Sequence, residues 1–212
     1  MDLAIIGSGE LAGEIFDLIN SCDEKNKYSK IFFVDLKSNS EKNTVSEEEF
    51  FKSDVNNSRI IIAMGEPEMR RKMAEKYFQK GFKMATFIHP KSCIAKTAVI
   101  KEGCVVFPFV YVAVNTVIGS NSIIHASCCI ENDCKTGENC FISSNSFIGA
   151  KTTVENNCFI GPSSVLRDTV IIKENDIIGM GSVVTKSTEG NSVYVGNPAR
   201  KIRENTSKKV FK

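Results

Sequence analysis

An aliphatic residue stands at every sixth position from Ile94 to Val184, and only Thr136 interrupts this series of sixteen positions. An amphipathic helix repeats its apolar residues every three or four positions, and an alternating strand repeats them every two. A period of six therefore predicts short strands separated by tight turns. Each strand then contributes one large side chain to a shared interior.

Small side chains follow many of these aliphatic residues by four positions, and five of the eight cysteines are among them: Cys104, Cys128, Cys134, Cys140 and Cys158. A narrow interior needs this alternation of large and small, and free cysteine serves there as a small buried hydrophobe. The sequence has no Cys-x-x-Cys pair, so we expect reduced, structural cysteines and no metal site. Gly119 and Gly149 directly follow an aliphatic residue of the series, which predicts close passage of neighbouring chain segments.

The first 89 residues follow a different pattern, in which apolar strands alternate with helices. Residues 3–6, 30–35, 59–64 and 84–88 predict four strands. Helical spacing after Gly13, a capping box at Ser46 and Glu49, and the segment 66–80 predict three helices between them. This order predicts a small open parallel sheet of the Rossmann-like α/β type. We expect domains at 1–89 and 90–188, followed by a C-terminal tail at 189–212.

Basic and acidic residues nearly balance, at 27 and 25 for a net charge of +2. Nothing in this balance indicates a nucleic acid or an anionic membrane as a partner. No run approaches the roughly 18 apolar residues that span a bilayer, and the first residues lack the basic segment of a signal peptide. We expect a cytoplasmic protein.

The turn Gly7-Ser8-Gly9 follows the first strand and opens a helix, an arrangement whose backbone N–H groups suit a phosphate. Asp35 ends the second strand, where such folds often bind a ribose. A tight turn that needs glycine and a solvated strand end are the alternative interpretations. The turn also raises the hypothesis of a dinucleotide-dependent oxidoreductase, but about 88 residues supply only half of a full dinucleotide fold.

The hexapeptide series resembles that of the hexapeptide-repeat acyltransferases, in which three six-residue faces form one coil of a left-handed parallel β-helix. Over nearly the whole chain, the order of parts resembles the PglD/NeuD-like family of sugar O- and N-acetyltransferases. The residues that carry the resemblance are Gly7-Ser8-Gly9-Glu10, Gly65-Glu66-Pro67 with Arg70, Phe87-Ile88-His89-Pro90, Ile130-Glu131-Asn132-Asp133-Cys134, Ile178-Gly179-Met180-Gly181-Ser182-Val183-Val184 and Val195-Gly196-Asn197-Pro198-Ala199-Arg200.

This resemblance implies a trimeric acyltransferase that uses acetyl-CoA as co-substrate and acts on a nucleotide-linked amino sugar for surface glycan biosynthesis. It implies that the nucleotide lies on the N-terminal domain, at Gly7, Ser8, Gly9, Asp35, Gly65 and Arg70. It places acetyl-CoA between neighbouring subunits, with the Ala150 N–H on the thioester carbonyl. Gly179, Gly181, Pro198 and Arg200 line the remainder of the cofactor, and the C-terminal tail lies near this site.

The chain departs from the family at one position, because family members usually carry His before an acidic residue where this sequence has Asn132-Asp133. An amide cannot accept a proton at any useful pH. Three explanations are open: an inactivating His-to-Asn change, a reaction that needs no base because the sugar amine is partly neutral, or a different base.

Only two histidines are available as that base. His125 lies one hexad before Asn132 and on a different face, where it either lines a neighbouring groove or is a surface side chain. His89 precedes Pro90 at the domain junction and is interpreted as structural. An O-acetyltransferase of a sialic-acid-type sugar and a catalytically impaired scaffold are the alternative functions.

Overall fold

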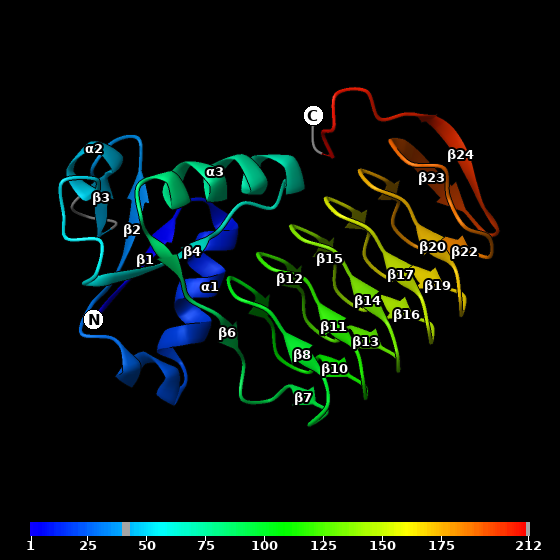
Figure 1. Cartoon of the computed structure of the whole chain (residues 1–212), viewed down its shortest axis with the longest axis horizontal. Coiled ribbons are helices and arrows are strands. Elements are labelled where there is room, and N and C mark those ends of the chain that lie inside the picture. The colour runs from blue at the N-terminus through cyan, green and yellow to red at the C-terminus, as the bar shows by residue number, and fades with distance from the viewer. Residues whose placement is uncertain (40–42, 211–212) are drawn as a thin grey trace.

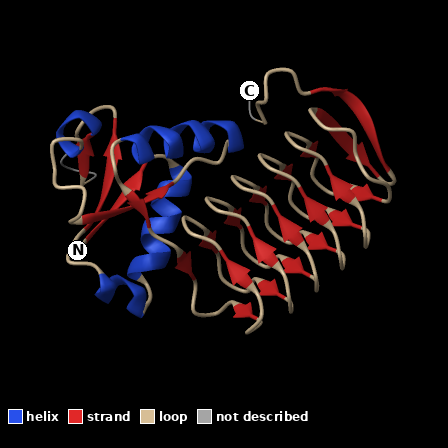
Figure 2. Cartoon of the chain, in the orientation of Figure 1, coloured by secondary structure: helices blue, strands red, loops and turns tan. Residues whose placement is uncertain are grey.

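The structure is a computed structural model that describes residues 1–39 and 43–210. Figure 1 shows an N-terminal α/β domain beside a prism of stacked coils, and Figure 2 shows that all helices lie in the first part of the chain. The helices are α1 (Glu10–Asn20), the 3-10 helix η1 (Asp23–Lys27), α2 (Glu47–Phe50) and α3 (Pro67–Gln79).

The N-terminal sheet is parallel throughout and has the strand order β3-β2-β1-β4-β5. Its strands are β1 (Asp2–Ile6), β2 (Ile31–Asp35), β3 (Thr44–Ser46), β4 (Ser58–Ile62) and β5 (Lys83–Met84). One face packs against α2 and α3. The other face packs against α1. The predicted Rossmann-like sheet is confirmed, with β3 as an additional edge strand.

The C-terminal part is the predicted left-handed β-helix, with three parallel sheets that we call faces 1, 2 and 3. Face 1 contains β6 (Phe87–Ile88), β9 (Val105–Val106), β12 (Ile123–Ile124), β15 (Phe141–Ile142), β18 (Phe159–Ile160) and β21 (Ile177–Ile178), continued by β23 (Ser192–Gly196) and the antiparallel β24 (Ala199–Glu204). Face 2 contains β7 (Cys93–Ile94), β10 (Tyr111–Val112), β13 (Cys129–Ile130), β16 (Phe147–Ile148), β19 (Val165–Leu166) and β22 (Val183–Val184). Face 3 contains β8 (Val99–Ile100), β11 (Val117–Ile118), β14 (Lys135–Thr136), β17 (Thr153–Val154) and β20 (Ile171–Ile172).

The six-residue period is confirmed, because each residue of the series from Ile94 to Val184 is the second residue of a two-residue strand. From Val106 onward all of these side chains are buried. The five predicted interior cysteines are also buried, at 0 or 1% exposure. The large and small side chains therefore alternate in one continuous core.

From residue 101 onward, the corners between faces are four-residue turns with a left-handed residue at the third position. Asparagine takes this position most often, since it tolerates positive φ better than other residues with a side chain: Asn115, Asn121, Asn139, Asn145, Asn157 and Asn175. A Cβ on Gly119 would lie 2.1 Å from the Gly137 carbonyl oxygen, and one on Gly149 would lie 2.6 Å from the Asp168 nitrogen. The predicted close passage at these glycines is confirmed.

The predicted strand 84–88 is wrong as a single strand. Met84 ends β5 in the N-terminal sheet, whereas Phe87 and Ile88 pair with Val105 and Val106 in the β-helix. One apolar segment thus contributes strands to two different sheets. The periodicity of the sequence alone does not show where the first strand ends and the second begins. The boundary between residues 89 and 90 stays a prediction.

The two domains share one hydrophobic core. Ile15 and Ile19 of α1 belong to the same cluster as the outward side chains of face 1, such as Phe141 and Phe159. The C-terminal tail also returns to this region, because the Val210 N–H donates to Glu66 Oε1 at 2.7 Å (Figure 1). The N-terminal domain therefore lies against the β-helix over a packed apolar surface.

Arg70 of α3 connects the two domains through its guanidinium. The side chain is fully buried and donates to the carbonyl oxygens of Asn121 (2.9 Å), Asn139 (2.6 Å) and Met64. Burial lowers the pKa of Arg70 to about 10, so the side chain remains charged at neutral pH. Its cost of burial is offset by these charge-assisted hydrogen bonds.

Replacing Arg70 with Met should lower the free energy of unfolding by roughly 3 kcal/mol or more. Three buried carbonyl oxygens lose their donor, at about 1–3 kcal/mol each. The matched control is Arg71→Met on the same helix, whose partners Glu68 and Glu75 lie near the surface, and it should cost less than about 1 kcal/mol. Urea unfolding measures both values, and equal effects would contradict the assignment of Arg70 to the junction.

Thiol labelling of the native protein should be confined to Cys22, Cys93 and Cys129, which have exposed surface. Burial raises the pKa of Cys104 and of Cys128 to about 12, so these thiols form little reactive thiolate at neutral pH. The five interior cysteines should react only after unfolding. Mass spectrometry that finds more than three thiols labelled before unfolding would contradict this placement.

Candidate active site

A cavity of about 290 Å³ lies at the carboxyl ends of the N-terminal strands. Strand order reverses between β1 and β4, and ligands of open parallel sheets bind at such a point. Gly7 follows β1, Asp35 ends β2 and Met64 follows β4, and all three line the cavity. Met69, Met73 and Tyr77 of α3 supply an apolar wall.

The Gly7–Gly9 turn has the geometry expected for an approaching ligand. Gly7 adopts φ +108°, a conformation that L-residues with side chains rarely take. A Cβ on Gly9 would meet no atom within 4 Å, so the start of α1 faces open space. The Ser8 hydroxyl donates to Asp35, and the other carboxylate oxygen of Asp35 accepts from the Leu36 N–H at 2.7 Å. Gly7, Ser8 and Asp35 are thus brought together as predicted.

Two of the residues predicted to bind the nucleotide lie outside this cavity. Gly65 follows Met64 before α3 and is not part of the cavity lining described above. Arg70 has no exposed surface, and its three guanidinium nitrogens all donate to backbone carbonyls. In this structure the Arg70 guanidinium therefore lies at the domain junction.

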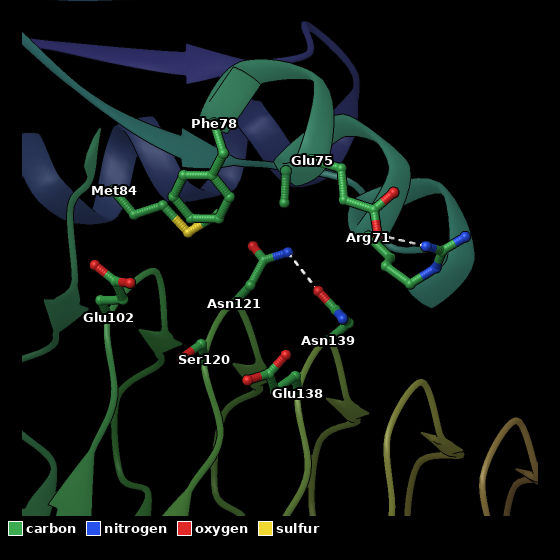
Figure 3. A pocket seen from close by; sticks show the side chains of 10 residues that line it. Arg71, Glu75, Phe78, Met84, Glu102, Ser120, Asn121, Glu138 and Asn139 are labelled. Atoms are coloured by element: carbon green, nitrogen blue, oxygen red, sulfur yellow. Dashed lines mark hydrogen bonds and ion pairs between the residues drawn. The ribbon is translucent and has the colours of Figure 1, made fainter. Parts of the chain in front are cut away.

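A second cavity, of about 260 Å³, lies between α3 and the corners that join face 3 to face 1. Figure 3 shows Asn121 and Asn139 on its floor, joined by a hydrogen bond of 2.7 Å, with Phe78 and Met84 opposite. Arg71 and Glu75 form an ion pair at its edge. The sequence patterns do not single out this cavity, since its lining comes from both domains.

Asn132 and Asp133 lie on the corner that joins face 2 to face 3, which we call corner 2–3. The Asn132 amide donates to Asp133 Oδ2 at 2.8 Å, and the Asn115 amide donates to Asp133 Oδ1 at 3.1 Å. These two hydrogen bonds lower the pKa of Asp133. Asp133 therefore remains an anionic carboxylate at neutral pH.

Ala150 lies one coil above Asn132 on the same corner, since the Lys151 N–H donates to the Asn132 carbonyl at 2.9 Å. Its own N–H donates to Asp168 Oδ1 at 3.1 Å. The amide predicted for a thioester carbonyl thus already has an acidic partner, which a ligand at this point must displace. Asp168 is eighteen residues beyond Ala150, so the repeat itself places it there.

His125 lies on a different corner, between faces 1 and 2, which we call corner 1–2. Its ring stacks on Phe107 with centroids 4.1 Å apart. Its Nδ1 lies 2.5 Å from the Ser144 hydroxyl, and its Nε2 lies 3.3 Å from Glu14 of α1. Glu14 precedes His125 by 111 residues, so no sequence pattern links them. The other histidine, His89, is buried beside Phe87 and accepts from the Lys91 N–H.

Gly179 and Gly181 share corner 1–2 with His125, three coils further along the prism. A Cβ on Gly181 would meet no atom within 4 Å. Pro198 and Arg200 belong to the terminal β23–β24 hairpin. Arg200 and Lys186 line a cavity of about 430 Å³ at the C-terminal end of the prism.

The described residues form no group of three or more His, Cys, Asp or Glu side chains suited to a metal ion. Within the same part of the chain, no helix is long and apolar enough to cross a membrane. Apart from Gly65 and Arg70, the predicted site residues therefore fall into three places within one chain. They are the nucleotide-type cavity, corner 2–3, and corner 1–2 with the adjoining prism end.

Two family profiles match the chain. The GMPPB C-terminal domain matches residues 88–194, half of the chain, and the PglD N-terminal domain matches residues 2–77. These matches correspond to the β-helix and to the α/β domain, respectively.

Solved structures with the same fold include three bacterial proteins. The acetyltransferase domain of PglB from Neisseria gonorrhoeae FA1090 has a TM-score of 0.88 and 22% identity, over 95% of this chain and 99% of that one. WeeI from Acinetobacter baumannii AYE has a TM-score of 0.88 and 22% identity, over 95% and 100%. A histidine-to-asparagine variant of perosamine N-acetyltransferase from Caulobacter crescentus, in complex with CoA and GDP-perosamine, has a TM-score of 0.87 and 23% identity, over 96% and 98%.

These structures share the fold of the present chain over at least 95% of its length. With the PglD N-terminal profile ahead of the hexapeptide β-helix, the chain belongs to the PglD/NeuD-like family of sugar acetyltransferases.

Proposed function

We propose that this protein is an acetyl-CoA-dependent N-acetyltransferase of a nucleotide-linked amino sugar. One observation carries the proposal. The predicted catalytic and acetyl-CoA-binding residues of the β-helix lie mainly on corners 1–2 and 2–3, and these two corners flank the same face of the prism, face 2. The relatives support it, since the C. crescentus enzyme is a perosamine N-acetyltransferase solved with CoA and GDP-perosamine. The PglB domain was also solved with acetyl coenzyme A.

A trimer with face 2 toward its axis would unite these corners. The outward row of face 2 carries no charged residue: Cys93, Tyr111, Cys129, Phe147, Val165 and Val183. Face 1 is covered by the N-terminal domain. The outward row of face 3 contains Lys135 and Thr153. Around a threefold axis, corner 1–2 of one subunit then adjoins corner 2–3 of the next.

The acceptor's nucleotide belongs in the cavity at the ends of β1, β2 and β4. The N–H groups at the start of α1 and the helix dipole suit its phosphates. The Asp35 carboxylate suits a ribose hydroxyl, and the methionines of α3 suit the flat base. Asp35 already accepts from Ser8, which orients the carboxylate.

Acetyl-CoA belongs in the groove between subunits. Gly179 and Gly181 open corner 1–2 for its pantetheine arm, Pro198 lies beside it, and Arg200 with Lys186 offers positive charge to its phosphates. Near the expected position of the thioester, the Ala150 N–H donates to the Asp168 carboxylate. A carbonyl oxygen in place of the Asp168 carboxylate would be polarised by that N–H.

The acceptor amine would meet Asp133, whose lowered pKa keeps it an anion for the ammonium group. Asn132 donates to this carboxylate and orients it. The C. crescentus variant supports the idea that a histidine-to-asparagine change in such a protein is compatible with binding, since it holds CoA and GDP-perosamine. We place the reaction in the cytoplasm. We retain the domain limits 1–89, 90–188 and 189–212.

The activity is tested by the mass of the product formed from acetyl-CoA and a panel of UDP-, GDP- and dTDP-linked amino sugars. We expect one acceptor to gain a single acetyl group on its amine. The matching sugars with a hydroxyl in place of the amine serve as controls and should not react. Acetylation of the hydroxyl sugars alone would favour the O-acetyltransferase alternative.

Phe147→Arg should convert the trimer to monomers and abolish acetyl transfer, because three charges would be buried without partners around the axis. Phe147 is 36% exposed on face 2, and Ile171 on face 3 is 37% exposed. Ile171→Arg is therefore the matched control and should leave a trimer. Light scattering measures the mass, and a native monomer would contradict the proposed site.

Gly9→Val should weaken acceptor binding by at least tenfold, because its methyl groups fill the open space at the start of α1. The fold should be retained, since Gly9 has an ordinary negative φ of −80°. Gly13→Val is the control, because a Cβ there also meets no atom within 4 Å. Calorimetric titration with the nucleotide sugar distinguishes them, and equal affinities would remove the nucleotide from this turn.

A further inference from the structure

Glu14, His125 and Ser144 form a hydrogen-bonded chain at the domain junction. The His125 ring lies between the Ser144 hydroxyl, 2.5 Å from Nδ1, and the Glu14 carboxylate, 3.3 Å from Nε2. Phe107 stacks on the ring at 4.1 Å and fixes its plane. The imidazole side chain is 20% exposed. These three contacts hold the ring in one orientation.

The charges of Glu14 and His125 determine the direction of the hydrogen bonds among the three side chains. An ionised Glu14 only accepts, so Nε2 of a neutral His125 carries the hydrogen and donates it. Nδ1 then holds a lone pair, and the Ser144 hydroxyl donates to it. The result is a serine hydroxyl backed by a proton acceptor, whose other nitrogen is oriented by a carboxylate.

The position of these three side chains on the prism is as informative as their geometry. Ser144 lies on corner 1–2, the same corner as Gly179 and Gly181. In the proposed trimer this corner faces Asn132 and Asp133 of the neighbouring subunit. Asn132 cannot accept a proton. The groove would therefore hold an anion for the ammonium group on one side and a proton acceptor on the other.

We infer that Glu14, His125 and Ser144 are the proton relay of the acetyl transfer, and that each subunit supplies it to a site whose Asp133 belongs to its neighbour. This inference rests on the proposed function. Glu14 acts as a positioning residue for the ring, His125 accepts the proton, and Ser144 contacts the acceptor amine.

The transfer balances without any further reactant. The ammonium group first releases one proton to solvent, and the neutral amine nitrogen then attacks the thioester carbon, so that a C–N bond forms and the C–S bond breaks. The nitrogen loses its proton to Ser144 Oγ while the Ser144 proton passes to His125 Nδ1. The imidazolium then protonates the departing CoA thiolate. Both the relay and the thiol are restored at the end.

The relay also joins the two domains. Glu14 belongs to α1, the helix whose first residues face the proposed nucleotide site. Glu14 follows Gly9 by five positions, which is about 7.5 Å along a helix. The helix that would hold the acceptor's phosphates therefore also positions the His125 ring through Glu14.

The decisive experiment measures steady-state acetyl transfer by His125→Gln, Ser144→Ala and Glu14→Gln. His125→Gln should lower kcat by about 100- to 10,000-fold, the range typical of a lost general base. KM should change little, because the imidazole acts in the transition state.

Ser127→Ala is the matched control, since it removes an exposed hydroxyl from the same corner. It should retain the native rate. Binding of CoA to His125→Gln, followed by calorimetry, shows that the variant is folded. A His125→Gln variant that binds CoA and turns over at the native rate would overturn the relay. Acetylated Ser144 in the mass of the native protein would also overturn it, because Ser144 would then be a nucleophile.

Mixed trimers test whether the relay acts across subunits. Co-expression of His125→Gln and Asp133→Ala chains creates interfaces in which an intact relay faces an intact Asp133. Activity above that of either variant alone supports the inference, and mixed trimers without such a gain overturn it. No product from the native chain with any acceptor would instead overturn the proposed function, and the relay with it.

Discussion

The stacking of one coil on the next, with residue i bonded to residue i+18, is the constraint on which the remaining structure depends. Tyr111 pairs with Cys129 and Cys129 with Phe147, and the same register holds on every face. Each side chain therefore belongs to a vertical column. A column fixes which residues are neighbours more strictly than a loop does, because its backbone is bonded above and below. The corners can thus carry chemistry without any helix or long loop to position it.

The β-helix was predictable from sequence because one periodic pattern encodes both its strands and its interior. Aliphatic side chains at six-residue spacing and cysteines four positions later are local features. The N-terminal sheet was also predictable, except where one apolar run from Met84 to Ile88 is divided between two sheets. Local periodicity contains no information on where a chain changes partners, so this division needed the three-dimensional structure.

The candidate site was only partly predictable. Ser8 and Asp35 meet as expected, because strand ends of a parallel sheet share one edge. Arg70 was assigned to a ligand, yet its partners are carbonyl groups 51 and 69 residues away in the sequence. The contact of Glu14 with His125 spans 111 residues. Contacts between the two domains depend on how their folded surfaces pack together. The spacing of residues within either domain does not predict this packing.

The shared core between α1 and face 1 has a consequence for selectivity. Ile15 and Ile19 pack into the same cluster as Phe141, and buried Arg70 joins α3 to the corners beyond. The N-terminal domain is consequently not a hinged module, and the span from the start of α1 to the prism corners is a fixed length. For the proposed reaction, the protein then selects its acceptor by the distance between the phosphates and the amine. A substrate is accepted when the number of bonds between its phosphates and its amine matches that span, whichever sugar fills the gap.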